Sequence, residues 1–312
     1  MPYFRKERDR AYPDGAMYAK FVHYTSAENA LKIIKSKRLW MRNTRCMADY
    51  REVTHGYELV SDFFDSKGNE QNFYTAFEAG PVRDAAEHGV ELFRGWLRDI
   101  HSETYVASIS KHDDKEDRYG RLSMWRAFGD GGTRAAIVLK VPAHSGASSI
   151  LLFSFSPVAY LSREEVHEHI SFVIDNIRNC ADVLHPISKM VAGWVYSMLV
   201  HAVVCLKHEV FKEEQEWRVI YAPNRLPAPS RHMKRTIKTI GGTPQIIYEL
   251  PLDEKVSPEL APIDLKNIFD RLIIGPSQYA REIRSAFVVA LNENGVSEDE
   301  SRVTASDISL RT

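Results

Sequence analysis

The spacing of apolar residues predicts short strands near both ends of the chain and helices between them. Residues 20–24 and 39–43 are rich in the apolar and aromatic residues that favour strands. Between these strands, apolar residues recur at the spacing of one helical face: Ala27, Ala30, Leu31 and Ile34. Thr25 is predicted to cap this helix, because Glu28 stands three residues later, as a capping box requires.

The same criteria assign the rest of the chain. The predicted strands are residues 105–110, 135–141, 151–160, 217–221, 246–250 and 271–276. The predicted helices are residues 50–64, 82–99, 123–128 and most of 162–208, and a last one carries Ile283, Phe287, Ala290 and Leu291. Strands at both ends with helices between them predict an α+β fold: a mixed sheet, a helical insertion at about 162–209 and a C-terminal strand–helix unit. No Pro- or Gly-rich linker divides the chain, which favours a single catalytic domain over 1–312.

Composition and charge then narrow the class of protein. Forty-one basic and 42 acidic residues give a net charge of −1, which argues against a general nucleic-acid coat protein. The one basic cluster, residues 231–238, is interpreted as a solvated loop. The three cysteines are scattered, the first ten residues are too charged for a secretory signal, and no apolar stretch reaches the length of a membrane span. We therefore expect a cytoplasmic protein without a membrane partner.

The segment from Glu214 to Arg218 carries the strongest candidate chemistry. Side chains alternate along a strand, so Glu214, Glu216 and Arg218 are expected on one face. The opposite, apolar face would consist of Trp217, Val219 and Tyr221. Two neighbouring carboxylates push their pKa values apart, which suits a division between acid/base and electrostatic roles. An exposed edge strand with a weak Glu–Arg pair explains the same residues, and the strand alone does not exclude it.

Two further segments contain candidate binding residues, and for each segment a purely structural role is the alternative to ligand binding. His23, Tyr24 and Thr25 stand where a strand meets a helix. Taken alone, this segment favours the structural explanation, a half-buried histidine beside a helix cap. Trp125 could stack on a flat ring and Arg126 could bind phosphate, although an amphipathic turn with the tryptophan in the core is the alternative. On the strand 105–110, Ser108 is a weaker candidate.

Several familiar motifs are missing from the sequence. No glycine-rich dinucleotide or phosphate loop follows a strand, and no G-x-S-x-G nucleophile elbow is present. His208 and Glu209 lack the second histidine of a zinc-protease helix, so no metal site is predicted.

Taken together, the quoted segments resemble the bacterial DUF2971 family, whose members contain a domain of unknown function. The family pattern is a His-Tyr-Thr-Ser start, a Leu-Trp pair, a central Met-Trp pair and a late Glu-x-Glu-Trp-Arg strand. The corresponding residues are His23 to Ser26, Leu39 and Trp40, Met124 and Trp125, and Glu214 to Arg218. The Asn-Asp-Pro-Phe signature that often follows the second strand is not intact: Asn43 and, later, Asp49 and Tyr50 stand there.

The order of these motifs is also similar to the His–Tyr–Glu arrangement of ADP-ribosyltransferases, which bind NAD without a glycine loop. This resemblance implies NAD as the substrate and Glu216 as the residue that holds the ribose and stabilises an oxocarbenium-like state. Glu214 would orient the nucleophile. The resemblance further implies that His23 and Thr25 hold the adenosine ribose, Arg126 the pyrophosphate, and Tyr24 or Trp125 the nicotinamide, with Tyr50 a weaker stacking candidate. On this basis, Glu216→Gln should abolish NAD turnover and leave the melting temperature nearly unchanged.

Two other function classes fit the same residues. One is a non-enzymatic sensing or interaction module, for example of an antiphage defence system. The other is a metal-dependent nuclease that uses Glu213, Glu214, Glu216 and Asp130. A toxin-like transferase would act on a protein or nucleic-acid target, and a neutralising antitoxin or defence partner would fit that role.

Overall fold

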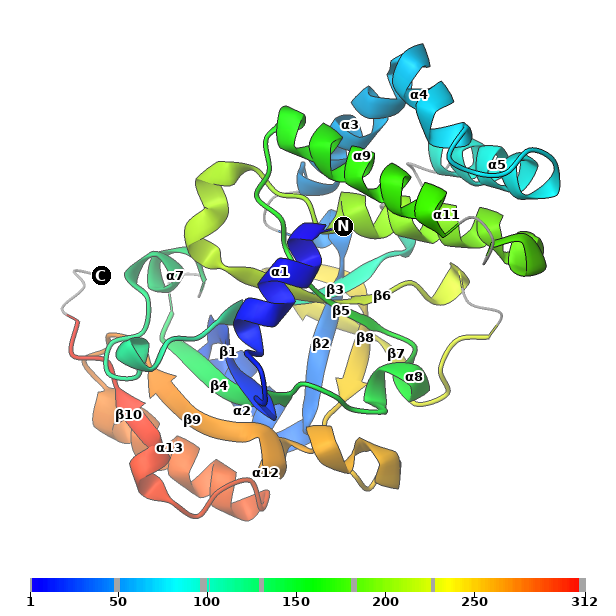
Figure 1. The fold of residues 1–312 in the computed structure, drawn as a ribbon. Helices are drawn as coiled ribbons and strands as arrows, with labels where there is room; N and C mark the ends of the chain where they lie inside the picture. The colour runs from blue at the N-terminus through cyan, green and yellow to red at the C-terminus, as the bar shows by residue number, and fades with distance from the viewer. Residues whose placement is uncertain are drawn as a thin grey trace. The chain divides into compact units, whose positions relative to one another are not determined.

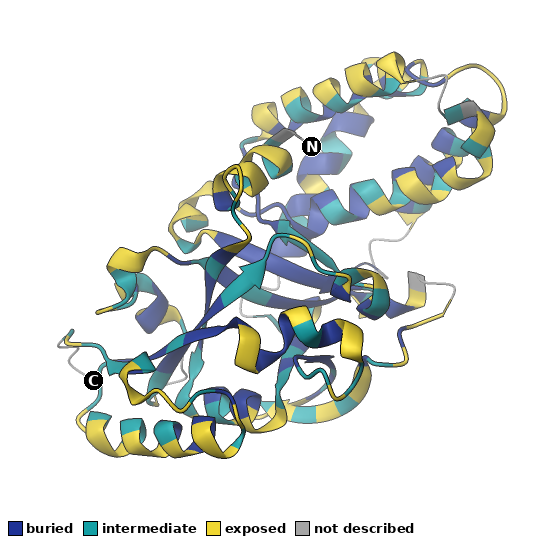
Figure 2. Ribbon diagram, turned by 60° about the horizontal axis from the view of Figure 1, so that its bottom comes forward, coloured by how far each residue is buried: buried dark blue, intermediate teal, exposed yellow. Residues whose placement is uncertain are grey.

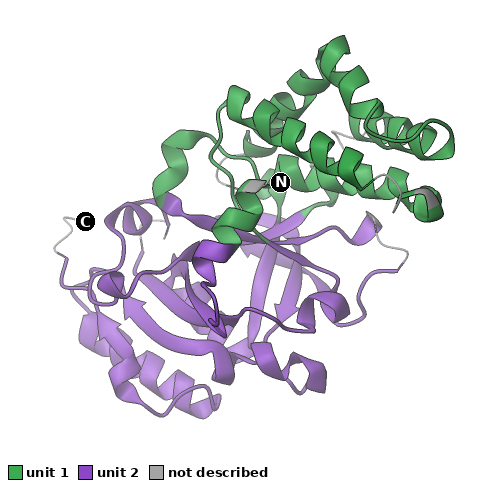
Figure 3. Cartoon of the chain, viewed as in Figure 1, with its two compact units in different colours: residues 1–8, 43–104, 156–213 green, residues 9–42, 105–155, 214–312 purple. Residues whose placement is uncertain are grey.

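A computed structural model describes residues 2–47, 51–95, 100, 102–128, 132–180, 184–225 and 228–308. The chain forms two compact units (Figure 3). Unit 1 comprises residues 1–8, 43–104 and 156–213, and unit 2 comprises residues 9–42, 105–155 and 214–312. Each unit is therefore assembled from separate stretches of the sequence. The predicted insertion at about 162–209 accounts for only one of the two long stretches in unit 1.

Unit 1 is helical. Its main helices are α3 (Glu52–Asp65), α4 (Lys67–Tyr74), α5 (Pro81–Gly95), α9 (Arg163–Asn179) and α11 (Ser188–Val204), and its 3-10 turns are η1 (Thr44–Cys46), η3 (His185–Ile187) and η4 (Glu209–Glu214) (Figure 1). Helices α3 and α5 correspond to the predicted helices 50–64 and 82–99, although residue 50 and residues 96–99 lie outside the described residues. Within the described part of the chain, no helix is long and apolar enough to cross a membrane.

Helix α11 packs against α3 and α5 at positions where glycine allows close approach. A Cβ atom at Gly56 of α3 would lie 2.2 Å from the carbonyl oxygen of Val203, and one at Gly89 of α5 would lie 2.7 Å from that of Ala192. Both distances are shorter than any side chain tolerates against backbone. The helix backbones therefore pack in direct contact, which a larger residue at either glycine would prevent.

Unit 2 is built on a mixed sheet. Its strands are β1 (Tyr18–Ser26), β2 (Arg38–Asn43), β3 (Tyr105–Lys111), β4 (Arg134–Pro142), β5 (Ser154–Pro157), β6 (Glu216–Tyr221), β7 (Lys234–Ile240), β8 (Thr243–Pro251), β9 (Phe269–Ile274) and β10 (Val303–Ala305). Along the sheet the order is β10-β9-β4-β1-β3-β2-β8-β7, with β6 beside β3 and β5 beside β6. The described pairings are antiparallel except for the parallel pair β10–β9. The predicted α+β fold class is confirmed.

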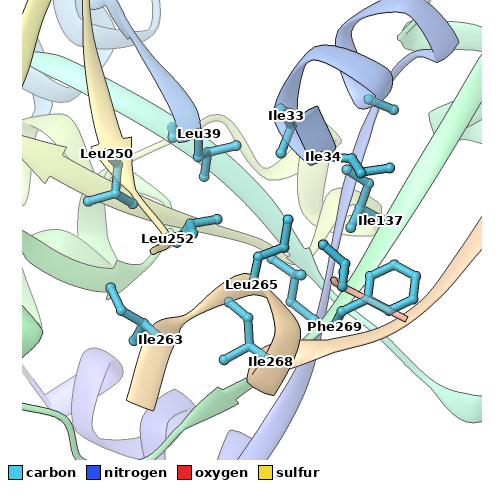
Figure 4. Packing of buried hydrophobic residues seen from close by; sticks show 14 of the residues in the cluster. Ile33, Ile34, Leu39, Ile137, Leu250, Leu252, Ile263, Leu265, Ile268 and Phe269 are labelled. Atoms are coloured by element: carbon cyan, nitrogen blue, oxygen red, sulfur yellow. The ribbon is translucent and has the colours of Figure 1, made fainter. Parts of the chain in front are cut away.

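The largest core of unit 2 lies on one face of this sheet. It combines strand residues with α2 (Ala27–Ser36), α12 (Leu265–Ile268) and α13 (Ala280–Glu293), and Figure 4 shows Ile33 and Ile34 of α2 in the cluster that also contains Ile137 and Phe269. Figure 2 shows that buried residues follow the central strands, while exposed residues follow the outer sides of the helices. The remaining short elements are α1 (Pro2–Ala11), α7 (Leu122–Ala127), α8 (Ala147–Leu151), η2 (Asp114–Glu116), η5 (Pro223–Arg225), η6 (Pro258–Ile263) and η7 (Glu300–Arg302).

Three local predictions are wrong. Thr25 does not cap α2: β1 continues to Ser26, and the Ser26 side chain accepts the hydrogen bond from the Asn29 amide at 3.2 Å. The basic cluster predicted as a loop contains strand β7, because pairing with β8 outweighs the low strand preference of its lysines. The strand predicted over 151–160 is reduced to β5, since α8 extends to Leu151.

Candidate functional site

The adjacent strands β1, β3 and β6 bring three distant segments of the sequence together. Val22 of β1 pairs with Ser110 of β3, and Ser110 pairs with Glu216 of β6. One step further along, Ser108 pairs with Arg218. Paired residues share a face of a sheet, so Ser108, Ser110, Glu216 and Arg218 form a polar patch on the face that Val22 also shares.

The ladder between β1 and β3 is short, and a side chain continues it. Only two residue pairs are formed, and beyond them the His23 imidazole meets the Ser108 carbonyl oxygen at 3.0 Å through Nδ1. Because a carbonyl only accepts, Nδ1 carries the hydrogen and donates it. Burial lowers the pKa of His23, although the bond to Ser108 opposes this shift. The imidazole is therefore neutral at neutral pH.

The alternation of β1 separates the predicted binding residues into two groups. Phe21 contacts Trp217 with ring centroids 5.1 Å apart, which defines one face. His23 and Thr25 follow Phe21 at two-residue steps and share that face. Tyr24 follows Val22 and lies on the face of Glu216. The structure thus brings Tyr24, Ser108 and Glu216 to one side of the sheet and places His23 and Thr25 on the other.

Glu216 and Arg218 form a buried ion pair on β6. Arg218 Nε donates to Glu216 Oε1 at 2.8 Å, and Arg218 Nη2 donates to Glu216 Oε2 at 3.1 Å. The two residues are only 5% and 1% exposed. Such a two-point guanidinium contact fixes both the position and the plane of the carboxylate. The weak, exposed Glu–Arg pair considered as an alternative is therefore excluded for this pair.

Glu214 does not belong to the strand, so the prediction that it shares a strand face with Glu216 is wrong. It ends η4, and β6 begins only at Glu216. Between them, Gln215 has a φ of +45°, a left-handed conformation that interrupts the alternation. Backbone strain of this kind at a non-glycine residue is frequent at functional sites. Glu214 itself is half-buried.

Arg121 ties this region together, and the sequence analysis did not identify it. Its guanidinium donates to both carboxylate oxygens of Glu116 at 2.9 and 3.2 Å, to the Glu214 carbonyl oxygen at 3.0 Å and to the Lys111 carbonyl oxygen at 3.1 Å. Its amide donates to the Tyr24 hydroxyl at 2.8 Å. Arg121 therefore joins β1, the end of β3 and the entry to β6. Gly120, which precedes Arg121, has a φ of +65°, and the Trp125 ring packs against its backbone. This glycine is the feature of the sequence that could have drawn attention to the position of Arg121.

The two aromatic candidates are packed against each other. Tyr24 and Trp125 meet edge to face with centroids 4.9 Å apart, and Trp125 Nε1 donates to the Tyr119 carbonyl oxygen at 2.7 Å. Trp125 is fully buried, so it offers no free ring face in this structure. Burial raises the pKa of Tyr24 to about 12, which keeps its hydroxyl neutral. Arg126 is exposed on α7, while Tyr50 and Asp130 lie outside the described residues.

Ser108 supplies the remaining polar group of the patch. Its Oγ atom is buried and has no hydrogen-bond partner among the residues that the structure describes. A buried hydroxyl without a partner loses the hydrogen bonds it made to water, so it has capacity for a ligand. No group of three or more His, Cys, Asp or Glu side chains within the described ranges could hold a metal ion.

A carboxylate near this region allows a prediction for stability. Burial alone would raise the pKa of Asp270, but hydrogen bonds from Lys140 and Arg271 outweigh it and lower the pKa to about 2. The ordinary value is 3.8, so Asp270 stabilises the fold above that pH by about 2 kcal/mol. This contribution is lost as the pH falls through about 2. Urea unfolding of the protein and of Asp270→Asn should give free energies whose difference shrinks in acid; a difference independent of pH would contradict the assignment.

Comparison with known proteins gives a match to one family model. Residues 124–219 match the family model described as "Protein of unknown function (DUF2971)". The match includes Met124 and Trp125 and the segment from Glu214 to Arg218, and it confirms the predicted resemblance to that family over this part of the chain. No curated protein and no solved structure gives a significant match.

Proposed function

We propose that this chain, a DUF2971 protein by its central segment, is an NAD-dependent ADP-ribosyltransferase whose active site is the Glu216 face of unit 2. The observation that supports this proposal is a carboxylate fixed at two points beside an unsatisfied hydroxyl. Arg218 holds both oxygens of Glu216, and the Ser108 hydroxyl on the same face has no partner among the described residues. A preorganised negative charge with a neighbouring polar group suits a reaction in which positive charge develops on a sugar.

The proposed reaction breaks the bond between the nicotinamide nitrogen and C1′ of the ribose. The bonding electrons leave with nicotinamide, and C1′ acquires oxocarbenium character. The Glu216 carboxylate stabilises that charge and accepts a hydrogen bond from a ribose hydroxyl. A nucleophile of the acceptor forms the new bond to C1′ and loses its proton, and we assign the acceptance of that proton to Glu214, two residues before Glu216.

The other predicted binding residues are divided between the two faces of the sheet, so only some of them can act with Glu216. Ser108 and Tyr24 share it with Glu216, and Arg126 is exposed on α7 and open to a pyrophosphate. His23 and Thr25 belong to the opposite face, so the proposal does not depend on their binding the adenosine ribose. Trp125 supports Tyr24 from the core instead of stacking on a ligand.

Incubation of the purified protein with NAD tests the proposal directly. Nicotinamide release is measured by chromatography. We expect it to continue in the presence of EDTA, because no step of the proposed reaction uses a metal. A lysate supplied with labelled NAD should then reveal the modified acceptor by mass spectrometry. Absence of nicotinamide release by the folded protein, with NAD and lysate both supplied, would refute the assignment.

One observation favours a second candidate, a non-catalytic sensing module. Both oxygens of Glu216 are engaged by Arg218 inside the protein, and a buried ion pair can serve the fold alone. An increase in melting temperature with NAD, without release of nicotinamide, would identify such a module. The two candidates therefore give different results in the same pair of measurements.

A further inference from the structure

A second chemically distinct surface lies on strands β2, β8 and β7 and their neighbour α2. Its centre is Trp40 of β2, which is half-buried. The ammonium groups of Lys32 and Lys238 lie 5.7 and 5.4 Å from the centre of the Trp40 ring. A tryptophan between two lysines from different elements is the core of what we call the Trp40 surface: Lys32, Arg38, Trp40, Lys234 and Lys238.

The strand register places these residues on one face. Trp40 pairs with Glu249 of β8, and Glu249 pairs in turn with Lys234 of β7. Arg38 precedes Trp40 by two residues, and its Nε lies 3.8 Å from Glu249. Lys238 Nζ lies 3.6 Å from the other oxygen of the same carboxylate. Glu249 is buried, so it positions the two cations from beneath the surface.

The charge on this face is positive although the protein as a whole is near neutral. Lys32 and Lys238 lie over the Trp40 ring, and Arg38 and Lys234 share its strand face. Among the described residues, the carboxylates that contact these cations are Glu249 and Glu28, which binds Lys32 at 2.5 Å. Arg38 adds a second, independent signal. Its Nη1 atom is buried and finds no hydrogen-bond acceptor among the described residues. A guanidinium nitrogen in that condition has a hydrogen bond to offer, and an anionic ligand is a suitable acceptor for it.

We infer that the Trp40 surface binds single-stranded nucleic acid. Phosphate groups match the cations, and an unpaired base matches the indole ring, which is the combination by which proteins hold single strands. The lysine–tryptophan contacts are weaker than lysine–phosphate contacts, so the ammonium groups can change partner and leave the ring free for a base. Duplex bases are already stacked and paired, which makes a single strand the better fit. The inference does not depend on the proposed transferase activity.

Protection of a free sheet edge explains only part of this surface. Strand β7 ends the sheet order, and lysines on edge strands prevent pairing with other chains. That explanation covers Lys234 and Lys238. It does not account for Trp40 or for the Arg38 nitrogen that has no acceptor among the described residues. Both residues belong to β2, which lies between β3 and β8 and is not an edge strand.

Fluorescence anisotropy with a labelled single strand of about 12 nucleotides tests the inference. We expect binding whose log affinity falls with log salt with a slope of about −2 to −3. The double variant Lys32→Gln/Lys238→Gln should bind about 10-fold more weakly and show a smaller slope. Trp40→Leu should also lose about 10-fold in affinity, with a nearly unchanged salt slope.

The matched control is Lys255→Gln/Lys266→Gln, which removes the same charge from another part of unit 2. These lysines lie near α12, where Lys266 pairs with Glu254. We expect this variant to bind as the unaltered protein does, and melting temperatures should show that all variants are folded. Equal affinity of the two double variants would overturn the inference, as would binding of heparin without binding of the oligonucleotide.

Discussion

Glu216→Gln is expected to reduce nicotinamide release at least about 100-fold, because the amide cannot offer the full negative charge that the transition state needs. The sequence alone predicts a nearly unchanged melting temperature for this variant. The buried pair with Arg218 alters that expectation. An amide in place of the carboxylate removes the negative charge that Glu216 holds against the buried guanidinium, which should cost about 3 kcal/mol of the free energy of unfolding.

Two further variants separate loss of chemistry from loss of fold. Asp270→Asn also alters a buried carboxylate held by cations in unit 2, so it should lower stability and retain NAD turnover. Combining Glu216→Gln with Arg218→Met removes the buried cation as well as the carboxylate, and it should recover stability without recovering turnover. Nicotinamide release by folded Glu216→Gln protein at the original rate would eliminate Glu216 as the catalytic carboxylate.

Gly56→Ala is expected to destabilise unit 1 by about 3 kcal/mol, which is the upper part of the range for an overpacked core. The new methyl group would lie 2.2 Å from the Val203 carbonyl oxygen, and backbone cannot rotate away as a flexible side chain can. Helix α11 would have to move from α3 to make room. Chemical denaturation followed by far-UV circular dichroism measures the change.

Gly193→Ala on α11 is the matched control for this effect. Gly193 is exposed, and apart from its chain neighbours and the adjacent backbone of its own helix, no atom of the described residues lies within 4 Å of the position its Cβ would occupy. Alanine favours a helix over glycine by about 0.5–1 kcal/mol, so this variant should be slightly more stable. If both substitutions changed stability by the same amount, close packing at Gly56 would not be the cause of its effect.

The sequence predicted those elements whose apolar pattern is strong. Strands β1, β3, β4 and β6 lie within a few residues of their predicted positions, because their apolar faces are also buried faces. The apolar pattern does not predict strand β7, because its residues are mostly basic and polar. Only its pairing with β8 identifies it as a strand. Helix α4 was missed for a related reason: among its residues only Phe73 is buried.

The candidate site was predictable in its parts and not in its arrangement. The residues of β1, β3 and β6 were identified, and their adjacency follows from the register. The positive φ of Gln215 is invisible in the letters, so Glu214 was assigned to the wrong element. Arg121 stands in a polar loop, where no periodicity distinguishes a buried guanidinium from a solvated one. Both features depend on tertiary contacts that local patterns do not contain.

The histidine that continues the β1–β3 ladder makes this junction tolerant of acid. In both the neutral and the charged imidazole, Nδ1 carries a hydrogen, so the bond to the Ser108 carbonyl oxygen persists in either form. Burial lowers the pKa of His23, so protonation at Nε2 costs stability as the pH falls below the ordinary value of 6.5. The two strands nevertheless stay linked while the ring takes up its proton. His23 can therefore gain a positive charge while its hydrogen bond continues to join β1 to β3.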